Sequence, residues 1–276
     1  MSITFADPER VIDLMKIAAA DIIMPRFQSL KDGEIDEKDG GELVTIADIE
    51  TEKWLTARLP DLLPGSVVVG EEAVFADRDV FDRLAGDDPV WVIDPIDGTW
   101  NFAHGRPVFA ILIALVYRGE VVSGWIYEPV TGTTVIGARG AGVTFDGKTV
   151  RLGADDRTDG FVGTAARYLF ERAETRTDVV DQVFRPNCAG HEYVLILSGE
   201  RAFSAYTKLL PWDHAAGSFL VREAGGYSAL LDKGRYNLAQ PKGDLLTAES
   251  AAVWHNIRAV LHEEDGAENQ GGTHVR

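Results

Sequence analysis

Apolar residues follow two different patterns along the chain, and each pattern predicts a different kind of element. From Val11 to Ile23 they recur every three or four positions, after an Asp7-Pro8 pair that suits the first turn of a helix. This spacing predicts a long amphipathic helix. Similar patterns predict further helices after Thr45 and over residues 192–197, 211–224 and 250–261.

Short unbroken apolar runs predict strands at residues 67–69, 90–93, 108–117, 121–127, 133–138, 161–163, 202–206 and 245–248. The runs between 108 and 138 are separated by short turns that contain glycine, which indicates an antiparallel meander. Strand and helix patterns alternate again after residue 161. The longest apolar run, at 108–117, is too short to span a bilayer, so we expect no membrane-spanning segment.

Two stretches lack any pattern that could pack into a core. Residues 31–42 are rich in glycine and charge, which predicts a mobile surface loop, with a flexible lid over a site as the alternative. The acidic, glycine-containing end from Glu263 to Arg276 predicts a disordered tail. We therefore expect residues 1–262 to form a single domain.

Composition narrows the possible partners and the cellular location. An apolar fraction of 45% over 276 residues is enough for one sizeable core. A net charge of −17 argues against partners with a negatively charged surface, so we expect neither a nucleic-acid polymer nor a membrane to bind. The single cysteine, Cys188, and the lack of a secretory signal favour a reducing compartment, and we expect the cytoplasm.

The strongest candidate chemistry follows the strand predicted at 90–93. Pro95 has no N–H and a fixed φ angle, so we expect the strand to end there in a stiff, extended loop. The carboxylates of Asp94 and Asp97 and the carbonyl of Ile96 could then face one small volume, which suits Mg²⁺. Backbone N–H groups of the next turn could hold an anionic oxygen. An ordinary solvated turn is the alternative.

Further acidic residues lie at the ends of other apolar elements. Glu71 and Glu72 follow the strand at 67–69, and because consecutive side chains point to different sides, we expect only one to reach a metal. Asp48 has the position of a capping-box acid, and Asp213 lies in the first turn of the helix at 211–224. Capping and the helix dipole explain both acids equally well, unless the fold brings them to Asp94.

Three motifs taken together resemble the inositol monophosphatase family of metal-dependent phosphomonoesterases: Gly70-Glu71-Glu72, residues 94–102 and Trp212-Asp213-His214-Ala215-Ala216-Gly217. The resemblance covers nearly the whole chain in outline. It implies an α+β fold, the αβαβα five-layered sandwich of the inositol monophosphatase and fructose-1,6-bisphosphatase type, usually as a homodimer. It also implies hydrolysis of small phosphate monoesters that depends on two or three Mg²⁺ ions and is commonly sensitive to Li⁺.

The resemblance also assigns the metal ligands by position. Glu71 and Asp94, with the carbonyl of Ile96, look like ligands of a first ion. Asp94, Asp97 and Asp213 look like ligands of a second ion, so that Asp94 bridges the two. A bridging carboxylate suits two neighbouring cations, which together neutralise the phosphate and orient a water molecule.

Catalytic roles follow from the same resemblance. Asp48 and Thr99 resemble the pair that positions the attacking water, with Thr99 passing its hydrogen bond to Asp48 as to a general base. Glu71 completes the predicted catalytic set. Gly98 and Thr99 would give backbone N–H groups to the phosphate. The expected reaction is direct in-line attack of water, without a phospho-enzyme.

The substrate side departs from the family pattern. Tyr206 stands seven residues before Asp213, where inositol-specific members place an acid, so inositol itself becomes a doubtful substrate. His191, near the start of a helix, and Lys208 are candidates for an altered specificity. The predicted substrate-binding set is Gly98, Thr99, Ala189, His191, Tyr206 and Asp213.

Two alternatives remain open from the sequence. The same metal core would serve a histidinol-phosphate phosphatase or a 3′(2′),5′-bisphosphate nucleotide phosphatase. A non-catalytic sensor of a cation or a phosphate ligand is the alternative from another class. A sensor would not need the water-positioning pair Asp48 and Thr99, so the sequence favours the enzyme.

Overall fold

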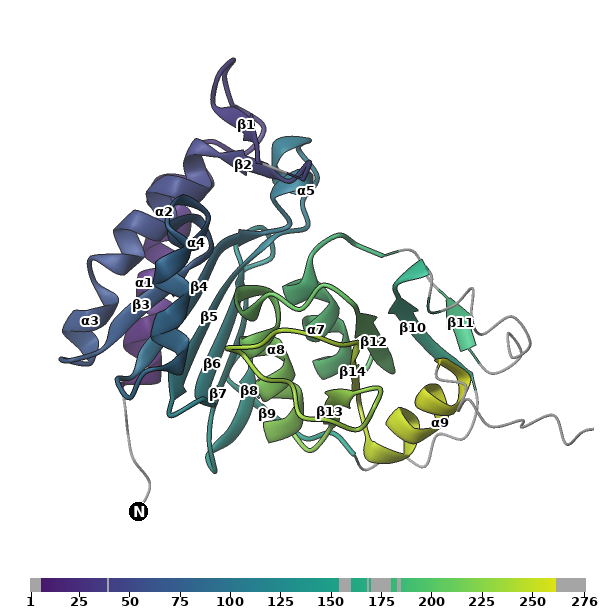
Figure 1. Ribbon diagram of the computed structural model, residues 1–276. Helices are drawn as coiled ribbons and strands as arrows, with labels where there is room; N and C mark the ends of the chain where they lie inside the picture. The colour runs from purple at the N-terminus through teal and green to yellow at the C-terminus, as the bar shows by residue number, and fades with distance from the viewer. Residues whose placement is uncertain are drawn as a thin grey trace, which may run out of the picture.

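A computed structural model describes residues 6–38, 40–153, 160–167, 169, 180–182 and 185–261. Two β-sheets lie stacked, with helices between them and on their outer faces (Figure 1). The tail predicted from Glu263 onward lies outside the described residues. Within the described part of the chain, no helix has the length and apolar character that crossing a bilayer requires.

The larger sheet has seven strands in sequence order along the sheet. β3 and β4 are parallel, and every later pair of neighbours is antiparallel, so the predicted meander is confirmed. The strands are β3 (Val67–Gly70), β4 (Val90–Asp97), β5 (Ala110–Tyr117), β6 (Glu120–Glu128), β7 (Thr133–Ala138), β8 (Gly142–Phe145) and β9 (Lys148–Val150).

The smaller sheet has five strands in the order β11-β10-β12-β14-β13. β10 is parallel to both β11 and β12, whereas β14 is antiparallel to β12 and β13. The strands are β10 (Phe161–Ala165), β11 (Val180–Gln182), β12 (Phe203–Tyr206), β13 (Tyr227–Leu230) and β14 (Leu245–Ala248). A separate hairpin consists of β1 (Ile35–Glu37) and β2 (Leu43–Thr45).

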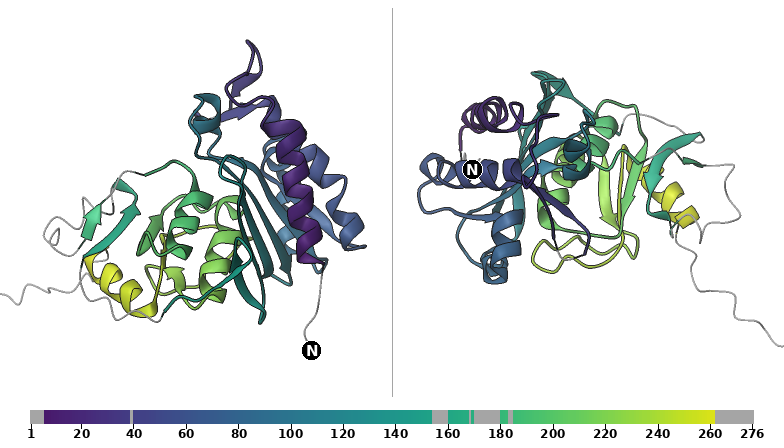
Figure 2. Two further views of the ribbon diagram at one scale, coloured as in Figure 1. Left: turned by 180° about the vertical axis from the view of Figure 1, so that it is seen from behind. Right: turned by 90° about the horizontal axis from the view of Figure 1, so that it is seen from above.

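The helices complete the layers. α1 and α2 cover one face of the larger sheet, α7 and α8 lie between the two sheets, and α9 packs on the smaller sheet (Figures 1 and 2). This arrangement confirms the predicted αβαβα sandwich. The helices are α1 (Pro8–Ala18), with a π-helical turn at Ala19–Ile23, α2 (Ile46–Thr56), α3 (Leu59–Leu62), α4 (Glu71–Ala76), a 3₁₀ helix at Arg78–Ala85, α5 (Thr99–Ala103), α7 (Ala189–Leu197), α8 (Pro211–Glu223) and α9 (Ala251–Leu261).

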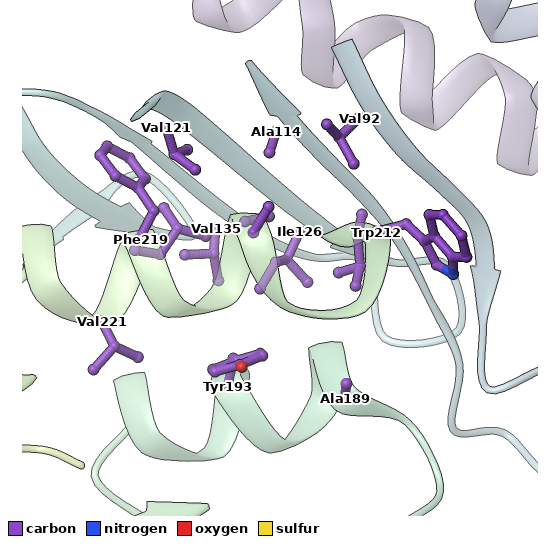
Figure 3. Packing of buried hydrophobic residues seen from close by; sticks show 14 of the residues in the cluster. Val92, Ala114, Val121, Ile126, Val135, Ala189, Tyr193, Trp212, Phe219 and Val221 are labelled. Carbon is purple, nitrogen blue, oxygen red and sulfur yellow. The ribbon is translucent and has the colours of Figure 1, made fainter. Parts of the chain in front are cut away.

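Alternate residues of the larger sheet pack on its two opposite faces. Val92, Ala114 and Ile126 point toward α8 (Figure 3). Trp91 and Ile113, each next to one of these residues in its strand, belong to the cluster that includes α1. Because both faces are covered, the central strands consist of unbroken apolar runs rather than alternating ones.

β4 is longer than the sequence indicates. We expected the strand to end at Ile93, but it runs to Asp97 and pairs again with Ala110 of β5 after a register shift between Asp94 and Asp97. Pro95 lies within this irregular stretch, where a missing ladder N–H is tolerated. The functional loop is therefore held by the sheet on both sides of the proline.

The prediction that residues 31–42 form a loop without packing was wrong for part of the segment. β1 lies within it and pairs with β2, which follows it, and Lys38 is only 6% exposed, whereas most of the other described residues there are exposed as expected. Gly40 and Gly41 both have positive φ angles, 101° and 86°, which lets the chain reverse between the two strands. Of the residues that the structure describes in this segment, Lys38 alone is buried, because it has acidic partners, and a search for apolar patterns does not detect a buried charge.

Candidate metal centre

Three carboxylates converge at one edge of the larger sheet. β3 and β4 are parallel neighbours, so their carboxyl ends meet at this edge. Glu71 directly follows β3, and Asp94 lies in the last part of β4. The first turn of α8, which packs on β4, carries Asp213. Ligand atoms of Glu71, Asp94 and Asp213 all lie within 4.8 Å of one another.

Asp94 is the most confined of the three. It is 2% exposed, and its Oδ1 is buried without a hydrogen-bond partner among the described residues. Burial, followed by the charges of Glu71 and Asp97, raises the pKa of Asp94 well above its ordinary value. An unpartnered buried carboxylate oxygen is costly, so this donor set fits a hard divalent cation bound through oxygen.

Asp97 differs from the three clustered carboxylates because its oxygens accept hydrogen bonds from the start of α7. Its Oδ1 accepts the backbone N–H of Ala189 at 3.0 Å. Its Oδ2 accepts the N–H of Gly190 and the thiol of Cys188, the latter at 3.2 Å. These bonds tie the end of β4 to the start of α7. A carboxylate has about four lone-pair sites, so Asp97 keeps capacity for a cation.

The two carboxylate oxygens of Asp48 contact two different residues, Thr45 and Thr99. The predicted capping box of α2 is confirmed, because the N–H and hydroxyl of Thr45 donate to Asp48 Oδ2 at 2.8 and 2.6 Å. Oδ1 is 3.1 Å from the Thr99 hydroxyl, which also lies 2.9 Å from the carbonyl oxygen of Ile96. Burial raises the pKa of Asp48 to about 7, close to the range that favours proton transfer at neutral pH.

Gly98 forms the turn between β4 and α5. Its φ angle is +90°, and a Cβ there would lie 3.0 Å from the carbonyl oxygen of Val108 and 3.2 Å from that of Asn187. Both the left-handed backbone and the close contacts require glycine. The turn places Thr99 as the first residue of α5, with its hydroxyl directed at Asp48.

Glu52 positions the acidic start of α4, a role that sequence patterns did not reveal. Its carboxylate accepts the backbone N–H groups of Glu72 and Ala73, each at 2.8 Å. A Cβ on Gly70 would lie 2.2 Å from the carboxyl carbon of Glu52, so only glycine allows this approach. In the sequence, the glycine directly before the two acids was the one indication that another group approaches the backbone closely at this point.

Lys38 was also missed by the sequence analysis. Its Nζ lies 2.8 Å from Glu71 Oε1 and 2.7 Å from Glu72 Oε1, and its side chain is 3% exposed. Burial alone would lower the pKa of Lys38, but the two glutamates raise it above its ordinary value, so the ammonium stays charged. In the sequence, the one indication of this role was that Lys38 is a basic residue within the otherwise acidic segment 32–42.

We expect Lys38→Met to destabilise the protein in EDTA by about 3 kcal/mol, because Glu71 and Glu72 lose their buried cationic partner. Mg²⁺ should reverse most of this loss, since the metal supplies positive charge to the same carboxylates. Thermal unfolding with EDTA and with Mg²⁺ measures both effects. Lys31→Met, at an exposed position, is the matched control. An equal loss under both conditions would contradict the shared use of these carboxylates.

The predicted substrate residues lie in different surroundings. The N–H of Ala189 is engaged by Asp97, as described above. His191 Nδ1 is 2.6 Å from Glu128 Oε1. Burial alone would lower the pKa of His191, but its hydrogen bond and ion pair with Glu128 raise it. The ring of Tyr206 packs on the buried His214, at 4.5 Å between ring centroids.

Lys208, the other specificity candidate, forms an ion pair with Glu42 at the end of the β1–β2 turn. His214 Nε2 lies 2.8 Å from the carbonyl oxygen of Lys208, and Tyr193 contacts the other ring nitrogen at 3.0 Å. Burial lowers the pKa of His214 to about 4, so its ring is neutral. The neutral histidine therefore links α7 and α8 to the segment that carries Lys208.

The sequence matches a known protein family and is similar to several known proteins. The model of the inositol monophosphatase family matches residues 7–264. A fructose-1,6-bisphosphatase/inositol-1-monophosphatase of Thermotoga maritima is 32% identical over 204 residues, which is 70% of this chain and 75% of that protein. The Nus factor SuhB of Pseudomonas aeruginosa is 29% identical over 222 residues, 76% of this chain and 80% of that protein.

Solved structures share the same fold. An IMPase of Thermotoga maritima superposes with a TM-score of 0.76 at 26% identity, covering 92% of this chain and 95% of that one. The extragenic suppressor protein suhB of Bartonella henselae gives a TM-score of 0.78 at 23% identity, covering 92% and 97%.

Proposed function

The chain belongs to the inositol monophosphatase family and is a phosphoric monoester hydrolase, and we propose that it hydrolyses a small phosphate monoester by in-line attack of water. Proteins of this family depend on a metal ion. The observation that carries the proposal is the buried, unpartnered Oδ1 of Asp94 within a cluster of three carboxylates. No phospho-enzyme is involved.

The proposed metal is Mg²⁺, in two or three ions. Glu71, Asp94 and the Ile96 carbonyl would hold one ion, and Asp94, Asp97 and Asp213 a second. Mg²⁺, when bound, would supply positive charge against the phosphate and the leaving oxygen and would lower the pKa of a water molecule. The high pKa values of Asp94 and Asp213 without metal support this role, because burial and mutual repulsion leave both carboxylates in need of a cation.

The proton path uses Thr99 and Asp48. The Thr99 hydroxyl oxygen accepts a hydrogen bond from the attacking water, and its own hydrogen is donated to Asp48 Oδ1, 3.1 Å away. The carboxylate of Asp48 receives the proton as general base. Backbone N–H groups of Gly98 and Thr99 bind the phosphate oxygens. Glu71 takes part in catalysis through the metal that it would hold.

Ala189, His191, Tyr206 and Asp213 are the proposed contacts of the alcohol part of the substrate where it joins the phosphate. Inositol, sugar, amino-alcohol and nucleotide phosphates all remain candidates, including histidinol phosphate and 3′(2′),5′-bisphosphate nucleotides. We also propose a homodimer that works in the cytoplasm. A non-catalytic sensor is disfavoured because it would have no use for a pair that positions water, which is the role proposed for Asp48 and Thr99.

A substrate panel tests the reaction class. Phosphate release is measured from inositol 1-phosphate, histidinol phosphate, 3′-phosphoadenosine 5′-phosphate, fructose 1,6-bisphosphate and glycerol 2-phosphate, with Mg²⁺ and with EDTA. We expect at least one substrate to be hydrolysed, and EDTA to abolish its turnover, because Lys38 and Lys208 near the carboxylate cluster are already paired with Glu71 and Glu42 and leave the charge of the phosphate to the metal. Turnover that persists in EDTA would overturn the metal mechanism.

A further inference from the structure

A cavity of about 550 Å³ lies beside the metal centre, on the side of β3. Its walls come from the β1–β2 hairpin, from α4 with the 3₁₀ helix that follows it, and from the segment that leads into α8. Glu71 belongs both to this wall and to the carboxylate cluster. A group attached to a phosphate at the cluster could therefore extend into the cavity.

The part of the wall nearest to α4 is apolar and aromatic. Phe75 lies four residues after Glu71, so the two side chains share one face of α4. Phe75 is 52% exposed, although most large apolar side chains among the described residues are buried. Val74, Phe81 and Leu210 continue the apolar surface. An exposed aromatic ring directly beside a candidate reaction centre suits contact with a ligand.

The charged groups of the wall are balanced. Three cations and three acids line the cavity: Lys38, Arg78 and Lys208 against Glu42, Glu71 and Asp82. Lys38 is paired with Glu71, and Lys208 with Glu42. A polyol ring needs many hydrogen-bond partners, and once these pairs are formed, Arg78 and Asp82 are the charged side chains of the wall that remain to supply them. An uncharged, flat ring would instead gain from contact with the exposed phenyl group.

We propose that this cavity binds an aromatic ring carried by the alcohol part of the substrate, and that Phe75 is the residue that selects it. The inference rests on the proposed phosphatase activity and narrows its substrate to monoesters with a nucleobase or an aryl group. Lys38 Nζ lies over the Phe75 ring, 5.4 Å from its centroid, so Phe75 contributes binding through the part of its ring that Lys38 leaves exposed. It takes no part in the chemical step and affects recognition of the alcohol, not reaction at phosphorus.

The test compares substrates that differ only in the ring. Adenosine 5′-monophosphate is compared with ribose 5-phosphate, and 2-phenylethyl phosphate with ethyl phosphate, all with Mg²⁺. We expect the ring to raise kcat/KM about tenfold in at least one pair, the size of one stacking contact, and the favoured pair separates a nucleobase from an aryl group. Phe75→Ala should remove this advantage and leave the ring-free substrate unchanged, whereas Ile49→Ala, at another exposed apolar position, should change neither.

The remaining outcomes distinguish a failure of the ring site from a failure of the proposed phosphatase activity. If the ring gives no advantage in either pair, or if Phe75→Ala lowers both members of a pair equally, the ring site is overturned and the phosphatase stands. Phe75→Tyr, which keeps the ring, should retain the advantage, and its loss would also overturn the proposal. If neither these substrates nor any member of the panel described above releases phosphate, the proposed function fails and the ring site fails with it.

Discussion

Asp94→Asn is expected to lower kcat/KM for phosphate release by about a thousandfold or more, because several kcal/mol of transition-state stabilisation depend on the bound metal. The amide keeps the shape of the side chain but removes its charge and one of its acceptor oxygens. Asp94 alone is proposed to contact both ions, so its loss affects the whole centre. Calorimetric titration with Mg²⁺ should show weakened binding alongside the kinetic loss.

Stability separates this effect from simple misfolding. Asp94 is buried among acids that raise its pKa, so a neutral amide relieves repulsion and the thermal midpoint in EDTA should not fall. Asp61→Asn makes the same chemical change at an exposed position of α3 and should leave both turnover and metal binding intact. Wild-type turnover in the Asp94 variant would show that this carboxylate does not hold the metal.

Thr99→Val is expected to lower kcat by about a hundredfold while leaving Mg²⁺ affinity unchanged. Valine has nearly the same shape as threonine but cannot bind water or donate to Asp48, whose Oδ1 lies 3.1 Å from the hydroxyl. The carboxylates proposed as metal ligands are untouched, and the Ile96 carbonyl loses a hydrogen bond without changing its own chemistry. Steady-state kinetics and Mg²⁺ calorimetry on the same preparation distinguish loss of water positioning from loss of metal.

Thr99→Ser is the matched variant, because it restores the hydroxyl and removes one methyl group. It should keep kcat within about threefold of the wild type, since the hydrogen bond to Asp48 is retained. If serine and valine were equally harmful, the methyl group and its packing would matter and the proton path would be wrong. A full kcat in Thr99→Val would have the same meaning.

The sequence by itself determined the elements and the chemical character of the site. Unbroken apolar runs and helical spacings are local, so the meander of β5 to β7, the helix after Pro211 and the capping box of Asp48 could all be predicted and are confirmed. The motif residues Glu71, Asp94 and Asp213 could be named because they follow such elements directly. The layered fold followed from the resemblance that these motifs carry.

The tertiary structure decided which residues act on one another across the chain. Lys38 reaches Glu71 from a hairpin that sequence patterns read as a loop, and Glu52 holds α4 through backbone bonds that no side-chain pattern records. These contacts depend on buried charge, whose partners are far apart in sequence and leave no periodic trace. The cavity beside Phe75 likewise exists only once α4, the hairpin and the start of α8 meet, because packing and not local preference sets that meeting.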